Sequence, residues 1–419
     1  MDDIITDESD IFTDSSSYIF KDEYILSIEY IPDKLIGRSE QVQKIADLIN
    51  PLFRKGKPYS CLIYGKTGCG KTVVVKFVLN ALAKKVLQKD FDFNLKWIYI
   101  PCKQMNTVNE ILYFLITEID PKANISRKGH PLNAYYTLLW EEITQNNLSL
   151  IIVLDEIDQL KKDDILYNLS RAGELKNIPD RRFITIFGIS NDLNYVDRID
   201  PRVKSSSSFI DIIFEPYDSL QIKSILDDRV KLAFHPNVVP DELVSICAAR
   251  SAKSEGDARK AIDLLRTAGS IAAKEESPEI TIDHLDRADE MLSENRYLKL
   301  AADLPLHNKL ILLSVIKLAR LMSSERTTSA VIGTYLEICN YQNPKIEPLR
   351  RTTISGIIGE LEMLGFLKLK KLNRGRGGGV TRQIDIADKV PIELLTDVLY
   401  TDYNVDGLQE FVPKIYLFS

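Results

Sequence analysis

Short apolar runs alternate with segments of helical periodicity over the first half of the chain. Five of these runs have the length and composition of buried strands, and they occupy residues 59–65, 96–102, 148–156, 182–190 and 209–217. Continuous apolar strands separated by helices are typical of a parallel sheet that is covered on both faces. The pattern therefore predicts an α/β fold with a parallel sheet over residues 18–217.

Other patterns mark the rest of the chain. The apolar spacing is helical throughout residues 218–300, which predicts a separate helical lid. Over residues 301–419, helices are followed by a short β ribbon rich in Gly and Arg, which predicts a winged-helix domain. Residues 1–17 are acidic, contain several Ser and have few large apolar groups, so we expect a disordered tail.

Composition narrows the class of protein. The longest apolar run, near Ile151, is far too short to cross a bilayer, and the acidic N-terminus lacks a secretory signal. Five scattered cysteines show no metal or redox spacing, which indicates reduced thiols. We therefore expect a cytoplasmic protein with no membrane partner.

The charge is segregated along the chain. The formal net charge is −6, which by itself argues weakly against nucleic acid as a partner. Residues 1–23 hold eight acidic side chains and one Lys, however, whereas residues 350–382 hold eight basic and two acidic side chains. A basic face near the C-terminus is therefore compatible with the acidic total.

A phosphate-binding pattern, G-x-x-x-x-G-K-[ST], follows the first apolar run. It comprises Gly65, Lys66, Thr67, Gly68, Cys69, Gly70, Lys71 and Thr72. Glycines let backbone N–H groups point at phosphate oxygens, and the helix predicted next adds a positive end. We expect Lys71 to contact the β- and γ-phosphates and Thr72 to ligate Mg²⁺. A Gly-rich turn between a strand and a helix, without a ligand, is the alternative.

The third apolar run ends on an acidic pair, 84 residues after Lys71. Asp155 would hold the Mg²⁺ shell, and Glu156 would orient or activate the attacking water. The loop and the acidic strand end together predict an NTPase of the P-loop class.

Two further polar residues have an open interpretation. Asn191 follows the next strand and could bond the γ-phosphate or the lytic water, although Asn-Asp is also ordinary turn chemistry. Arg259 lies in the first turn of a predicted lid helix, where it could reach phosphates or simply face solvent.

These features occur in an order that resembles AAA+ ATPases. The segments at 36–45, 154–160, 188–193, 200–208 and 256–266 read IGRSEQVQKI, LDEIDQL, GISNDL, DPRVKSSSS and GDARKAIDLLR. They resemble the archaeal origin-recognition and cell-division-control family of replication initiators, from about Tyr30 into the C-terminal region. The resemblance implies a P-loop AAA+ module followed by a winged-helix domain, with ATP or ADP and Mg²⁺ as cofactors.

The resemblance also implies roles for single residues. The segment that packs near adenine in the family matches Ile36, Gly37 and Arg38. Asn191 matches the sensor 1 position, and Arg259 matches the sensor 2 position.

Arg202 matches the region that offers an arginine finger to a neighbouring subunit. Some relatives carry a second Arg a few residues on, where this chain has Ser205 to Ser208. This departure leaves three interpretations open: Arg202 serves as the finger, Lys204 serves instead, or hydrolysis is slow without one. We expect an ATPase with slow turnover that acts mainly as a switch.

The C-terminal region contains two candidate DNA contacts. A predicted recognition helix spans residues 350–366, and its polar N-terminal residues are Arg350, Arg351, Thr352, Thr353 and Ser355. The ribbon at 367–386 has a Gly-rich tip and carries the basic residues Arg374, Arg376 and Arg382. These cations suit phosphate or minor-groove contact, although a solvated hairpin on a protein-binding winged helix is the alternative.

The family has an insertion before the acidic strand that contacts DNA. The matching stretch here, residues 125–140, carries Arg127 and Lys128 beside Gly129. Two interpretations of this stretch are open: contact with the minor groove of DNA, or a basic surface turn without a ligand.

Three functions remain open for a chain with these features. The first is an ATP-dependent initiator that recognises origin DNA, with related initiator subunits and the replicative helicase as partners, in the cytoplasm at the nucleoid. The second is a transcriptional regulator of the same architecture at promoters. The third, a clamp loader or remodeler without specific DNA binding, is disfavoured by the recognition helix and the basic ribbon.

Overall fold

The structure is a computed structural model of the chain. It describes residues 18–414, apart from gaps at 89–90, 92, 124, 128, 200–201, 204–208, 254–255, 322–325, 343, 374–379, 403–404 and 406. The chain forms two compact units, residues 1–285 and 286–419.

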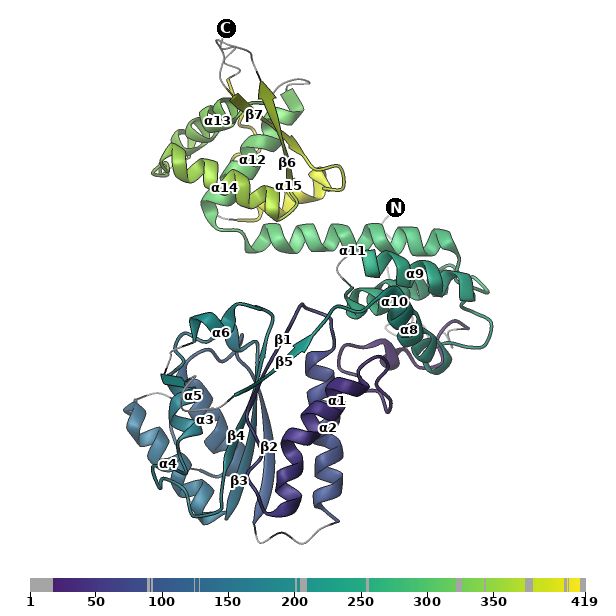
Figure 1. Ribbon diagram of the computed structural model, residues 1–419. Helices are drawn as coiled ribbons and strands as arrows, with labels where there is room; N and C mark the ends of the chain where they lie inside the picture. The colour runs from purple at the N-terminus through teal and green to yellow at the C-terminus, as the bar shows by residue number, and fades with distance from the viewer. Residues whose placement is uncertain are drawn as a thin grey trace, which may run out of the picture. The chain divides into compact units, whose positions relative to one another are not determined.

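A five-stranded parallel sheet is the centre of the first unit, with strands in the order β2-β3-β4-β1-β5 (Figure 1). The strands are β1 (Cys61–Gly65), β2 (Asn94–Pro101), β3 (Leu148–Asp155), β4 (Ile184–Ser190) and β5 (Ile210–Phe214). Four of them lie within the apolar runs, and β2 begins two residues before its run. The predicted parallel sheet is confirmed.

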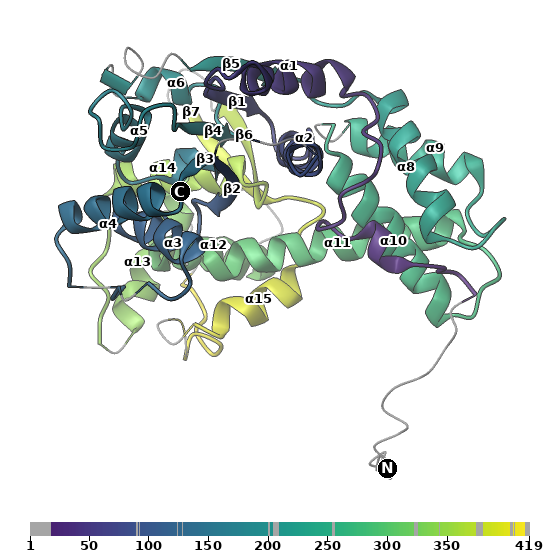
Figure 2. The same ribbon diagram turned by 90° about the horizontal axis from the view of Figure 1, so that it is seen from below.

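Helices cover both faces of this sheet (Figures 1 and 2). One face packs against α1 (Ser39–Ile49) and α2 (Lys71–Val86), and the other packs against α3 (Val108–Ile119), α4 (Leu132–Gln145) and α5 (Asp164–Ser170). Successive β1 residues alternate between the two cores, since Cys61 and Ile63 face the first pair of helices while Leu62 and Tyr64 face the second group. Burial on both faces explains why the strands are apolar without interruption.

Short elements complete this part of the unit. They are η2 (Glu23–Leu26), η3 (Asn50–Arg54), η4 (Ile157–Gln159) and α6 (Tyr195–Arg198).

Three helices after the sheet form the predicted lid: α8 (Ser219–Ala233), α9 (Asp241–Lys253) and α10 (Ala258–Lys274). Asp218 and Gln221 begin α8 with a capping box, in which each side chain accepts from the other residue's backbone N–H. Asp257 caps α10 by accepting from the backbone N–H groups of Arg259 and Lys260. Strong caps fix where these two helices begin, and hence where Arg259 lies.

Helix α11 (Ile282–Asp303) is continuous, and the division between the two units falls within it. The expected boundary at residue 300 lies in the same helix. None of the helices that the structure describes has the length and apolar content needed to span a membrane.

The second unit is a winged helix, as predicted. It contains α12 (Leu306–Leu321), α13 (Thr328–Tyr341), α14 (Arg351–Met363), β6 (Leu367–Asn373), β7 (Val380–Ile386) and α15 (Ile392–Tyr400). The apolar face of α14 buries Ile354, Ile358 and Leu361 in the core, and β6 pairs antiparallel with β7. This packing leaves the polar residues at the start of α14 on the surface.

Candidate functional site

The carboxyl ends of three neighbouring strands bring the predicted phosphate residues together. β4 lies between β3 and β1, so Asp155, Ser190 and Gly65 end their strands at the same edge of the sheet. Ligands of open parallel sheets bind at this edge. The sequence spaces these residues far apart, and the parallel pairing places them side by side.

The loop after β1 is shaped by glycines with positive φ, which L side chains rarely adopt. Gly68 has φ +74°, and a Cβ there would lie 1.7 Å from Oδ1 of Asp257 at the start of α10. Gly70 has φ +88°, and a Cβ there would lie 2.5 Å from the Tyr217 hydroxyl. The loop therefore needs glycine both for its backbone and for the close approach of the lid.

Lys71 is buried within the loop at 5% exposure. Its Nζ donates to the backbone oxygens of Gly65 at 2.6 Å and Lys66 at 2.8 Å, and to Asn191 Oδ1 at 2.9 Å. Burial lowers the pKa of Lys71, against the influence of Cys69 and Asp155. The loop and the end of β4 thus hold one ammonium group between them.

Oxygen ligands for a divalent cation lie next to this lysine. Asp155 is 8% exposed, and its Oδ2 accepts from Thr72 Oγ1 and from the Tyr99 hydroxyl, both at 2.8 Å. Among the described residues, no group of three or more His, Cys, Asp or Glu side chains could form a complete metal site. One hydroxyl and one carboxylate suit Mg²⁺ that takes its other ligands from phosphate and water.

Glu156 follows Asp155 with a left-handed backbone, at φ 53° and ψ 47°. Such a conformation is uncommon outside glycine, and residues that adopt it cluster at functional sites. Its backbone N–H donates to Asp155 Oδ1 at 2.9 Å, and the residue lines the same cavity. The turn therefore keeps both carboxylates at the edge of the sheet.

These residues line a cavity of about 400 Å³, which is within the range of small-molecule sites of roughly 300–1,000 Å³. Its lining includes the loop and strand-end residues Gly68, Gly70, Lys71, Thr72, Asp155, Glu156 and Asn191. Ile36 lines the cavity from the segment before α1, and the exposed Arg259 lines it from the lid. Because cations, glycines and acidic side chains line one cavity together, its residues fit a nucleoside triphosphate with Mg²⁺.

Arg38 is buried beside the phosphate loop. It is 3% exposed, and its guanidinium donates to Cys69 O at 3.0 Å and Glu215 O at 2.6 Å while stacking on the Tyr217 ring. Arg38 does not line the cavity. Arg38 therefore supports the backbone of the phosphate loop and does not face the cavity.

Six other expected residues also lie outside the cavity lining. Four belong to the phosphate loop: Gly65, Lys66, Thr67 and Cys69. The other two are Gly37 and Arg202. Gly37 has φ +68° and packs beside the Gln221 side chain of the lid. Arg202 is exposed, and its guanidinium carbon lies 5.9 Å from the centre of the Tyr167 ring.

Sequence reasoning missed several residues at the site. The charged residues Lys76, Arg229 and Asp263 line the cavity, and three others contact the expected residues. Tyr99 bonds Asp155 from the neighbouring strand, Tyr217 packs on Gly70, and Asp158 bonds the turn that carries Asn191. Only Asp158 had a visible signal, because it is a third acidic residue in the segment LDEIDQL.

The second unit presents its expected DNA residues on the surface. Arg350, Arg351, Thr352 and Thr353 are exposed where α14 begins, and Ser355 is partly exposed. On the ribbon, the exposed Lys371 and Arg382 lie directly opposite each other across β6 and β7. Like charges in that register destabilise a ribbon unless a polyanion is bound. Arg374 and Arg376 lie outside the described residues.

The insertion before α4 is partly described. Arg127 is exposed and pairs with Glu110 at 3.7 Å. Gly129 has φ +98°, and a Cβ at this glycine would meet nothing within 4 Å. Lys128 lies outside the described residues.

Three protein-family models match the chain. An AAA domain matches residues 54–189, a Cdc6 AAA+ ATPase-type lid domain matches 223–290, and a CDC6 C-terminal winged helix domain matches 299–393. Together they include the phosphate loop, most of the lid and α14.

Similar proteins cover almost the whole chain. The ORC1-type DNA replication protein of Pyrococcus abyssi is 37% identical over 93% of this chain and 92% of its own length. The structure of the Aeropyrum pernix ORC1 protein in complex with DNA has a TM-score of 0.78 at 31% identity, covering 93% of this chain and 98% of that chain. The Aeropyrum pernix ORC2 protein, in its ADPNP–ADP complexes, is 22% identical with a TM-score of 0.59 over 91% of this chain and 98% of that chain, a likeness of fold alone.

Proposed function

The chain belongs to the family of ORC1-type DNA replication proteins, and we propose that it recognises origin DNA under the control of bound ATP. ATP binding sets the conformation, and slow hydrolysis resets it. The observation that carries this proposal is the convergence of Lys71, Asn191 and the lid residue Arg259 on one cavity.

Nucleotide binding uses the loop and both strand ends. The loop N–H groups and Lys71 bind the phosphates, and Thr72 and Asp155 would hold Mg²⁺. When bound, the ion would neutralise charge that develops on the phosphates. Glu156 orients the attacking water, and Ile36 packs toward the base end of the cavity.

Contact between the lid and the phosphate loop supports a switch. The backbone N–H of Ala258 donates to Gly68 O at 3.3 Å, and Asp257 packs against the same glycine. Arg259 follows directly and lines the cavity, so its charge can respond to the γ-phosphate. When the nucleotide loses its γ-phosphate, the contacts that hold the lid on the phosphate loop would change.

Slow turnover is consistent with the position of Arg202. It does not line the cavity, and Ser205 to Ser208 stand where some relatives have a second Arg. We propose that a neighbouring initiator subunit receives Arg202 as a finger, because the side chain is exposed.

DNA binding uses the second unit. The exposed start of α14 offers Arg350 and Arg351 to phosphate and Thr352, Thr353 and Ser355 to base edges. On the ribbon, Lys371 and Arg382 lie opposite each other and contact DNA phosphates. Arg374 and Arg376 add positive charge to this contact. The relative from Aeropyrum pernix that was solved in complex with DNA supports DNA as the ligand.

Further contacts and partners complete the proposal. Arg127 and Lys128 would add a second DNA contact from the first unit. The replicative helicase would be recruited at the origin, in the cytoplasm at the nucleoid.

Two measurements test the proposal. Glu156→Gln should retain ATP binding and slow hydrolysis by about 100-fold, a typical loss for a positioned base, and normal turnover in this variant would reject the site. Genomic occupancy separates an initiator from a transcriptional regulator. Binding at promoters but not at replication start zones would favour the regulator.

A further inference from the structure

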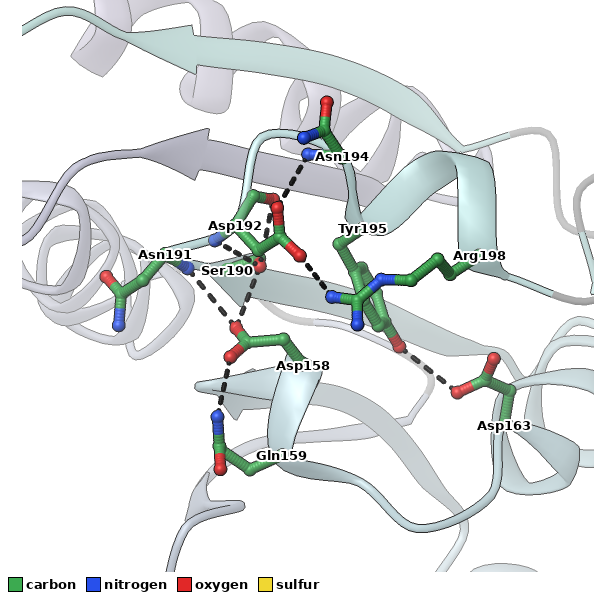
Figure 3. Close-up of polar contacts among 9 residues, drawn as sticks. All are labelled: Asp158, Gln159, Asp163, Ser190, Asn191, Asp192, Asn194, Tyr195 and Arg198. Atoms are coloured by element: carbon green, nitrogen blue, oxygen red, sulfur yellow. Dashed lines mark hydrogen bonds and ion pairs between the residues drawn. The ribbon is translucent and has the colours of Figure 1, made fainter. Parts of the chain in front are cut away.

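Asp158 joins two segments that end at the nucleotide cavity. It lies on η4, three residues after Asp155, and its Oδ1 accepts from Ser190 Oγ at 2.8 Å and from the backbone N–H of Asn191 at 3.2 Å (Figure 3). Its Oδ2 accepts from Gln159 Nε2 at 2.8 Å. One carboxylate therefore ties the turn after β3 to the turn after β4.

The turn that Asp158 holds carries the amide that meets Lys71. Asn191 is exposed, and its Oδ1 accepts from Lys71 Nζ at 2.9 Å. Ser190 Oγ also accepts from the backbone N–H of Asp192 at 2.9 Å, and Asp192 pairs with Arg198 on α6 (Figure 3). The Asn191 side chain thus projects into the cavity from a turn that is bonded on its opposite side.

We propose that Asp158 is a positioning residue that fixes Asn191 beside Lys71 and thereby favours a nucleoside triphosphate over a diphosphate. This inference rests on the proposed nucleotide function. Lys71 reaches the β- and γ-phosphates, so an amide held against it lies at the end of the site where the two nucleotides differ. Losing the tie lets the turn move, and a shift of about 1 Å weakens polar contacts strongly.

The charge of Asp158 agrees with this role. Burial opposes ionisation, but hydrogen bonds from Gln159, Ser190 and the Asn191 backbone together lower its pKa. The group is therefore an anionic acceptor at neutral pH. Charged acceptors form stronger bonds than neutral ones.

Three variants test the inference. Asp158→Ala removes the acceptor, whereas Asp158→Asn keeps one oxygen for Ser190 and Asn191. Asp163→Asn is the matched control, because Asp163 accepts from the Tyr195 hydroxyl at 3.2 Å in the same region and has no contact with Asn191 in Figure 3. Equilibrium binding of a non-hydrolysable ATP analogue and of ADP is measured for each variant with Mg²⁺.

We expect Asp158→Ala to weaken binding of the ATP analogue by about tenfold, roughly the contribution of one hydrogen bond, and to leave ADP binding within about twofold. Asp158→Asn and Asp163→Asn should stay within about threefold of the wild type for both ligands. Equal losses for the two ligands in Asp158→Ala, or wild-type binding of both, would overturn the inference and leave the proposed function standing. Wild-type protein that binds neither nucleotide would reject both.

Discussion

The proposed nucleotide cavity of the first unit and the proposed DNA-binding residues of the second unit hold their cations in opposite ways. Lys71 is 5% exposed, and three oxygen acceptors hold its ammonium group. Arg350, Arg351 and Arg382 are exposed, on a helix start and a ribbon. One site is organised before its ligand arrives, whereas the other relies on charge density.

This difference predicts that the two sites respond to amino-acid substitution in two different ways. In the cavity, each atom occupies a defined position, so single substitutions should act strongly and locally. On the basic surface, several cations make similar contributions that salt screens, so substitutions should act gradually and additively.

The largest effect is expected for Lys71→Ala. Removing the buried cation that we propose to bind the β- and γ-phosphates should weaken ATP binding by at least about 100-fold, since charge-assisted bonds contribute roughly 1.5–3 kcal/mol each. Titration with a fluorescent nucleotide measures the loss. Lys84→Ala is the matched control, because Lys84 is an exposed lysine in the last turn of the same helix. A similar loss of affinity in both variants would mean that the cavity, too, binds nucleotide through overall positive charge and not through one positioned lysine.

The next effect is expected for Gly68→Ala. The added methyl group would meet Asp257 at a backbone φ of +74°, so the lid must shift. We expect a loss of about 1–3 kcal/mol in the free energy of unfolding, the usual range for strain and overpacking. Chemical denaturation measures it, with Gly173→Ala as control, since a Cβ at Gly173 meets nothing within 4 Å. Unchanged stability would show that the lid is not seated on the loop.

A graded effect is expected for Arg350→Ala with Arg351→Ala. DNA affinity should fall, and the slope of log affinity against log salt should become shallower by about 0.9 for each phosphate that is no longer neutralised. Fluorescence anisotropy over a salt series measures both quantities. ATP affinity should stay unchanged, because the cavity is lined entirely by the first unit. An unchanged slope would remove the start of α14 from the DNA interface.

The smallest effect concerns pH. Burial lowers the pKa of Lys71 in the folded protein, so the unfolded chain binds more protons between that pKa and the ordinary value of about 10.4. The nucleotide-free wild type should therefore gain stability relative to Lys71→Met as pH rises through this window. Unfolding experiments on both proteins measure the difference. A constant difference would contradict the burial of the charge.

Local patterns were enough to predict the sheet and the phosphate loop. Uninterrupted apolar runs indicated strands that are buried on both faces. The glycines of the loop indicated a backbone conformation that only glycine adopts readily. The helix start at Asp257 was also visible, because capping depends on residues close in the sequence.

Contacts between distant segments could not be predicted in this way. Arg38 matched a segment that packs near adenine, yet its side chain lies behind the loop because Cys69 O and Glu215 O accept from it there. Tyr99 lies near Asp155 only because β2 pairs with β3. Such partners depend on strand order, which a single sequence does not encode in any local pattern.

The most direct test is to compare DNA binding in the two nucleotide states. Affinity for DNA from a replication start zone is measured across a salt series with a non-hydrolysable ATP analogue and with ADP, for the wild type and Lys71→Ala. The switch predicts that the two nucleotides give different affinities for the wild type and the same affinity for the variant. Equal affinities with both nucleotides for wild-type protein, at every salt concentration, would contradict it.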